Sequence, residues 1–173
     1  DIVLQLLSNE ETLAKYPFKF RLTINYMLEN NLLTTRVMIE NKDNKPMPFN
    51  FGLHPAFKVP QIEGEAYEDY KIVFNNPVNC TMPYIDLVKG LIDWNKESLT
   101  FDNVKEFNLN HDDFKNDAFI IEPYPQGPIQ IVSPSGKVVE ITTYGFKTLG
   151  IWSTHPTKSP FVLASTSHPL VYF

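Results

Sequence analysis

The chain has 173 residues, of which 43% are hydrophobic and 20% charged, an ordinary composition for a globular domain. Its net charge is −5 and only two of its 15 basic residues are arginine, Arg21 and Arg36, which argues against a nucleic-acid-binding protein. No apolar run approaches the roughly 20 residues that span a bilayer, and Cys80 has no second cysteine to pair with in this sequence. We therefore expect a cytoplasmic protein that binds neither nucleic acid nor membrane.

The first strong pattern along the chain is a β-hairpin. Residues 18–28 alternate between apolar and mostly polar positions, and this two-residue period predicts a half-buried strand. Residues 29–31 have the sequence of a turn, and residues 32–40 alternate again. The apolar side chains of both strands should therefore share one face. In the first strand these are Phe18, Phe20, Leu22, Ile24, Tyr26 and Leu28.

Shorter strand patterns follow the hairpin. Residues 41–48 contain two prolines and are expected to form a connection, and residues 75–110 are the least regular part, with several short pieces and turns. The Ser-Pro-Ser-Gly segment at residues 133–136 predicts a hairpin turn. The remaining strand-like runs are residues 67–74, 117–122, 129–132, 137–143, 149–153 and 161–164.

The fold class follows from this spacing. Many short strands about ten residues apart predict an all-β, antiparallel fold, and no segment of twelve residues has a helical period. Periodicity does not distinguish a sandwich from a barrel. Because no linker or repeat divides the chain, we expect one domain over residues 1–173.

Most short motifs that could carry chemistry have a structural interpretation. Residues 135–137, Ser-Gly-Lys, lack the preceding glycine of a phosphate loop and are better explained as part of a hairpin turn. His111, Asp112 and Asp113 offer metal-ligand side chains, but neighbouring residues in an extended chain point to opposite faces, so a solvated loop is preferred.

His54 is the strongest candidate for a functional residue. It lies in an apolar stretch and is followed by a proline that ends the strand pattern. It could be a core histidine bonded to backbone, or a proton donor that faces a cavity. An unperturbed imidazole pKa near 6.5 suits the second role near neutral pH.

The residues around His54 also carry a resemblance. Residues 50–57, Asn-Phe-Gly-Leu-His-Pro-Ala-Phe, resemble the Gly-x-His-Pro-Ala-Phe region of the aldose 1-epimerase (mutarotase) family, closest to its bacterial galactose mutarotase-like branch. Three further matches occur in the same order. They are Tyr-Pro-Phe at residues 16–18, Asn-Asp-Ala-Phe at 116–119, and Leu-Gly-Ile-Trp-Ser at 149–153 followed by Pro-Phe-Val at 160–162.

The resemblance implies an antiparallel β-sandwich of the supersandwich type and an enzyme that interconverts the α and β anomers of galactose or glucose without a metal or organic cofactor. It implies that His54 is the general acid that protonates the ring oxygen and that Asp117 binds sugar hydroxyls. Trp152 could be a platform on which a sugar ring stacks, or a core aromatic residue.

The chain departs from the family pattern in two places. Ser165 stands where the family has a glutamate that acts as the base, and a neutral hydroxyl is no base at pH 7. An upstream region with a His-Gly-Phe motif and a pocket arginine is also missing. We therefore expect a partial domain with an altered tail, and exposed strand edges that favour self-association. A sugar-binding module without catalysis and a structural remnant are the alternative interpretations.

Overall fold

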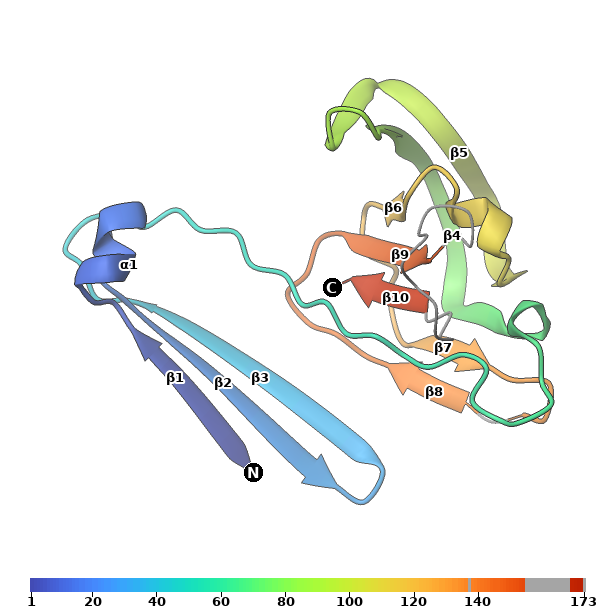
Figure 1. Cartoon of the computed structure of the whole chain (residues 1–173), viewed down its shortest axis with the longest axis horizontal. Coiled ribbons are helices and arrows are strands. Elements are labelled where there is room, and N and C mark those ends of the chain that lie inside the picture. The colour runs from blue at the N-terminus through green and yellow to red at the C-terminus, as the bar shows by residue number, and fades with distance from the viewer. Residues whose placement is uncertain (137, 155–168, 173) are drawn as a thin grey trace. The chain divides into compact units, whose positions relative to one another are not determined.

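The computed structural model describes residues 1–136, 138–154 and 169–172 (Figure 1). The chain divides into two compact units, Asp1–Phe51 and Gly52–Phe173, and each unit is described by itself. The prediction of a single domain stays a prediction. None of the helices in the described part of the chain combines the length and apolarity required to cross a membrane.

The first unit is a three-stranded antiparallel sheet with a short helix. Its order is β1-β2-β3. The predicted hairpin is confirmed by the pairing of β2 with β3 through a turn in which Asn30 has a left-handed φ of 53°, a conformation that asparagine tolerates. The elements are β1 (Ile2–Leu7), α1 (Glu10–Lys15), β2 (Phe20–Glu29) and β3 (Leu32–Asn41).

Strand β1 and helix α1 were not predicted from the sequence. Both faces of β1 carry apolar residues, so it lacks the period of two that reveals a strand. The helix has only six residues and depends on a local cap. In this cap the Asn9 side chain accepts a hydrogen bond of 2.9 Å from the Thr12 amide, and the Thr12 hydroxyl accepts one of 2.8 Å from the Asn9 amide.

The second unit contains two more antiparallel sheets. One has the order β5-β4-β7-β8 and the other the order β10-β9-β6. In Figure 1 the strands β4 and β5 form one long, curved hairpin. The strands are β4 (Lys71–Asp86), β5 (Leu91–Asn108), β6 (Phe119–Ile121), β7 (Ile129–Val132), β8 (Val138–Ile141), β9 (Leu149–Ser153) and β10 (Pro169–Tyr172), and the 3-10 helices are η1 (Tyr67–Asp69) and η2 (His111–Phe114).

The prediction of short, irregular pieces over residues 75–110 was wrong. This segment contains most of β4 and β5, two strands of 16 and 18 residues. Their register shifts at four places between Val73 and Tyr84, and each shift reverses which side chains share a face. The shifts remove the period of two from the sequence although the strands continue. The strand predicted at residues 161–164 lies outside the described residues.

The core of the second unit is built around aromatic side chains. The Phe119 ring of β6 lies edge-on to the Phe101 ring of β5, with centroids 5.7 Å apart, and 5.0 Å from the Phe114 ring of η2. Phe101, Phe114 and Phe119 are all buried. These contacts join β5, η2 and β6, so the segment from η2 to β6, which contains Asp117, is held between two packed rings.

Candidate functional site

His54 is exposed, in a segment whose burial alternates. From Phe51 to Lys58 every second residue is half-buried and those between are exposed. Leu53 and Phe57 pack against the core of the second unit, and His54 lies on the outward side. This exposure contradicts the interpretation of His54 as a sealed core histidine.

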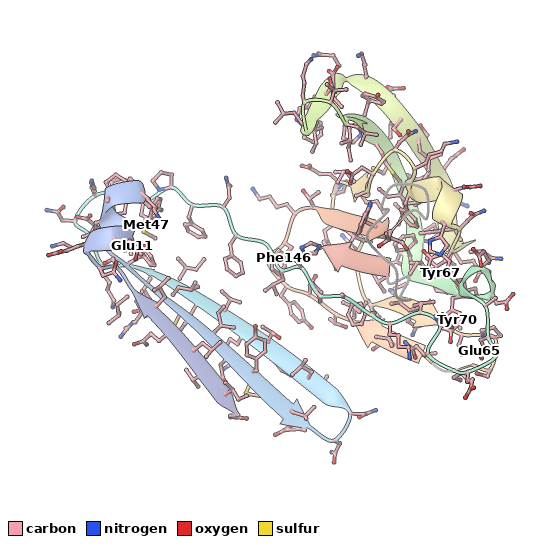
Figure 2. All side chains as sticks on the ribbon, in the orientation of Figure 1. Glu11, Met47, Glu65, Tyr67, Tyr70 and Phe146 are labelled. Carbon is pink, nitrogen blue, oxygen red and sulfur yellow. The ribbon has the colours of Figure 1, made fainter. Side chains whose placement is uncertain are left out.

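A hydrogen-bond network fixes the end of the loop that carries His54. The fully buried Tyr70 hydroxyl donates to the Glu65 carboxylate and accepts a hydrogen bond of 2.8 Å from the Gln61 amide. The same carboxylate accepts bonds from the Ser135 hydroxyl at 2.6 Å and from the Ser135 amide at 3.2 Å. Figure 2 labels Glu65 and Tyr70 in the segment that leads into β4. The loop is therefore anchored to the turn between β7 and β8.

Asp117 occupies a strained backbone position at the start of β6. Its φ is 82°, in the left-handed region that side chains other than glycine rarely adopt. Two local bonds hold it there, because its amide donates to the Phe114 carbonyl at 3.0 Å and its carboxylate accepts from the Ala118 amide at 2.8 Å. Asp117 is half-buried. Strain of this kind concentrates at functional sites, which is consistent with a binding role.

Trp152 lies on β9, beside the segment that contains Asp117. Ile151 pairs with Phe119 of β6, and both are buried in the core. Because side chains alternate along a strand, Trp152 points to the opposite face of this sheet from Ile151. Trp152 is half-buried and packs against the edge of the core. The Trp152 indole is therefore partly exposed and is not a fully buried core residue.

A second histidine, His111, belongs to a polar cluster that sequence reasoning missed. Its ring stacks on the Tyr67 ring with centroids 3.9 Å apart and an interplanar angle of 11°. Its Nδ1 lies 3.5 Å from the hydroxyl of Ser153, which is fully buried. Burial raises the pKa of the Tyr67 phenol, and the Ser153 hydroxyl lowers it in part. Asp112 and Asp113 are exposed, in agreement with the predicted solvated loop, whereas His111 is half-buried.

Ser153 of this cluster is the last residue of β9, next to the end of the strand that pairs with the start of β6. The register of β6 and β9 pairs Phe119, the first residue of β6, with Ile151, and Asp117 and Ser153 each lie two residues beyond this pair along the chain. The sequence signal for His111 was an Asn-His-Asp-Asp run, and Asn110 caps η2 by accepting a bond of 2.9 Å from the Asp112 amide. The local sequence could therefore have predicted the capped 3-10 turn that contains His111, but not the contacts of His111 with Tyr67 and Ser153.

Ser165, the position of the expected base, lies outside the described residues. Within residues 1–136 and 138–154, no three histidine, cysteine, aspartate or glutamate side chains gather in a way that could hold a metal ion. Cys80 is half-buried beside the core, and its thiol lies 3.9 Å from the Ile120 carbonyl.

Comparison with known families identifies the group to which the chain belongs. A sequence profile of the family described as aldose 1-epimerase matches residues 1–166. The chain belongs to the aldose 1-epimerase family. Two LacX proteins of Lactococcus lactis subsp. lactis, one encoded on a plasmid and one on the chromosome, are each 33% identical over 156 residues. These alignments cover 89% of this chain and 52% of each relative.

Solved structures agree with the family. A galactose mutarotase related enzyme from Lactobacillus acidophilus is 31% identical, with a TM-score of 0.83 over 99% of this chain and 54% of the other. A galactose mutarotase-like protein from Lactobacillus casei is 25% identical, with a TM-score of 0.73 over 98% of this chain and 56% of the other. The predicted all-β, galactose mutarotase-like sandwich fold is therefore confirmed, and the chain spans about half the length of these relatives.

Proposed function

We propose that this protein is a mutarotase-like isomerase that interconverts the α and β anomers of an aldose of the galactose or glucose class, in the cytoplasm and without a cofactor. The family match over residues 1–166 carries the proposal. Two structural features support it. His54 is exposed on an anchored loop, and Asp117 is held half-buried in a strained backbone conformation.

The reaction requires one proton donor and one proton acceptor on the two oxygens of the anomeric carbon. In the proposed mechanism the His54 imidazolium donates a proton to the ring oxygen while a base removes the proton of the anomeric hydroxyl. The C1–O bond of the ring breaks and an open-chain aldehyde forms. Rotation about C1–C2 and closure on the other face give the second anomer, and both protons return to their donors.

Asp117 and Trp152 are proposed to bind the sugar. A half-buried carboxylate can accept hydrogen bonds from sugar hydroxyls, and bonds to a charged acceptor are stronger than neutral ones. The face of an indole ring can support the apolar face of a pyranose ring. Trp152 lies on the opposite face of its sheet from Ile151 and is only half-buried, so part of its ring is open to such a contact.

The set of proposed catalytic residues lacks an identified base. The absence of a base favours a second candidate function. Ser165 stands at the position of the expected glutamate and cannot remove a proton at neutral pH. A missing group of this type typically costs about 10²–10⁴-fold in rate. A sugar-binding protein with little or no catalysis is therefore the alternative, and it predicts the same binding residues.

Polarimetry on freshly dissolved α-galactose and α-glucose tests both functions. We expect a weak acceleration over the spontaneous rate, which His54→Gln abolishes. Lys58→Gln is the matched control, because Lys58 is exposed on the same outward side of the same loop. Ser165→Glu should raise the rate. Sugar binding without any acceleration, lost in Asp117→Asn, would favour the binding protein. If no aldose binds and none is interconverted, both functions are wrong.

A further inference from the structure

His111 is held by two buried residues from other elements of the second unit. Its ring stacks on the ring of Tyr67 in η1 (Figure 2), with centroids 3.9 Å apart. Its Nδ1 lies 3.5 Å from the hydroxyl of Ser153 in β9. Tyr67 is 4% exposed and Ser153 is fully buried, whereas His111 is half-buried. The imidazole is therefore fixed by its neighbours and still partly open to solvent.

The two buried hydroxyls indicate which nitrogen of His111 carries a proton. A buried hydroxyl proton requires an acceptor. Within the described residues, the Tyr67 hydroxyl makes no hydrogen bond of normal geometry. Burial raises the pKa of this phenol, and the nearby Ser153 hydroxyl lowers it in part. Ser153 is therefore the acceptor available to Tyr67, and the His111 Nδ1 is the acceptor available to Ser153.

A chain of donors from Tyr67 to Ser153 and from Ser153 to His111 gives both buried protons an acceptor. The reverse direction would leave the Tyr67 proton without one. The His111 Nδ1 therefore accepts, and in a neutral imidazole the ring proton then lies on Nε2. In a charged imidazole both nitrogens carry protons, so Nε2 is a donor in either state.

His111 and Asp117 lie on the same side of one short segment. Three successive hydrogen bonds of the i to i+3 type run through it, from the amides of Asp113, Lys115 and Asp117 to the carbonyls of Asn110, Asp112 and Phe114, at 3.2, 3.3 and 3.0 Å. Such a run has three residues per turn and rises about 2 Å per residue.

The burial of this segment follows the same period of three. His111 and Asp117 are half-buried, Phe114 midway between them is buried, and the four other residues are exposed. The rise places the Cα atoms of His111 and Asp117 roughly 12 Å apart. One pyranose ring and two side chains can bridge this separation.

We propose that His111 belongs to the sugar-binding site and donates a hydrogen bond through Nε2 to one hydroxyl of the aldose, while Asp117 accepts a bond from another. Tyr67 and Ser153 are positioning residues, which hold the ring and its protons without contact to the sugar. This inference rests on the proposed binding of an aldose. It supplies a donor beside the acceptor Asp117, and a donor with an acceptor fixes the orientation of a sugar better than a carboxylate alone.

Imidazole nitrogen NMR on the full chain tests the assigned donor directly. At about pH 8, where an unperturbed imidazole is neutral, the His111 Nδ1 should give the signal of an unprotonated nitrogen and Nε2 that of a protonated one. Saturating galactose or glucose should shift the Nε2 proton signal. Ser153→Ala removes the donor to Nδ1, so a protonated Nδ1 should appear in its spectrum.

Calorimetric titration with the same sugars tests the contribution to binding. His111→Phe keeps a ring that can stack on Tyr67 but has no donor, and it should weaken binding about fivefold, as expected for one hydrogen bond. His111→Gln retains a donor on its amide and should keep most of the affinity. Lys115→Gln is the matched control, because Lys115 is exposed on the outer side of the same segment.

The possible failures are distinguishable. Sugar binding that Asp117→Gly abolishes and His111→Phe leaves unchanged would overturn this inference and leave the proposed function standing. Absence of any aldose binding to the unmodified chain would overturn both. A protonated Nδ1 in the unmodified chain would reverse the assigned direction of the hydrogen bonds. An Nε2 signal that saturating sugar does not shift would leave His111 a structural role only, and this measurement requires no variant to fold.

Discussion

The Glu65 carboxylate accepts a hydrogen bond of 2.6 Å from the Ser135 hydroxyl, across 70 residues of sequence. The same carboxylate accepts a bond from the fully buried Tyr70 hydroxyl. This contact connects the loop that carries His54 with the hairpin turn between β7 and β8. The loop therefore depends on a turn that shows no sign of function in the sequence.

Removal of the Glu65 carboxylate should destabilise the second unit. Glu65→Ala leaves the buried Tyr70 hydroxyl without its acceptor, and such a loss costs about 1–3 kcal/mol. Tyr70→Phe in addition removes that orphaned hydroxyl and should recover part of the loss. Urea denaturation of the three proteins measures the free energy of unfolding. If Glu65→Ala unfolds at the same urea concentration as the unmodified chain, the network contributes no stability.

The ion pair between Arg21 and Glu40 should make the first unit sensitive to acid. Hydrogen bonds from Arg21 and then Lys42 lower the pKa of Glu40 from 4.5 to about 2. A carboxylate with a lowered folded-state pKa adds stability that is present above its unfolded pKa. This contribution should be lost as the pH falls from about 4.5 to about 2.

Circular dichroism at several pH values tests this acid sensitivity. The melting temperature of the unmodified chain should fall between pH 5 and pH 2, and Glu40→Gln should reduce that fall. Glu29→Gln is the control, because Glu29 is an exposed glutamate at the end of the same sheet's β2 strand. An identical pH dependence in both variants would contradict the role of Glu40.

Alanine substitutions at two glycines can distinguish the cost of backbone strain from the cost of a steric clash. Gly64 and Gly127 have φ values of 87° and 82°, so alanine is strained at either position by about 1–2 kcal/mol. A Cβ at Gly64 meets nothing within 4 Å, whereas one at Gly127 lies 2.6 Å from the Asn75 side chain. Gly127→Ala should therefore lower the free energy of unfolding more than Gly64→Ala. Equal losses by urea denaturation would mean that Asn75 moves aside without cost.

Asp117 offers a test that separates binding from folding. Glycine relieves the strain of the left-handed φ of 82°, so Asp117→Gly should change stability by less than about 1 kcal/mol. Asp117→Ala retains the strain and loses the bond to the Ala118 amide, and should cost about 1–2 kcal/mol. Both variants should lose sugar binding in calorimetric titrations. Unchanged sugar affinity in the stable Asp117→Gly protein would remove Asp117 from the proposed site.

The sequence alone determined the elements whose patterns are local. The period of two over residues 18–28 and 32–40 predicted the hairpin of β2 and β3, and the Ser-Pro-Ser-Gly run predicted the turn before β8. The motif around His54 pointed to the family that the comparisons then established. These signals survive because each depends on residues that are neighbours in the chain.

Only the tertiary structure decided what depends on distant contacts. Register shifts within β4 and β5 hide two long strands from any period of two. Only the folded chain brings His111 to Ser153, 42 residues away in the sequence. The exposure of His54 follows from the packing of Leu53 and Phe57 on the core. Burial depends on which residues distant in the sequence come together, so it is decided only in the folded chain. A local pattern predicts only which side chains would be stabilised by burial.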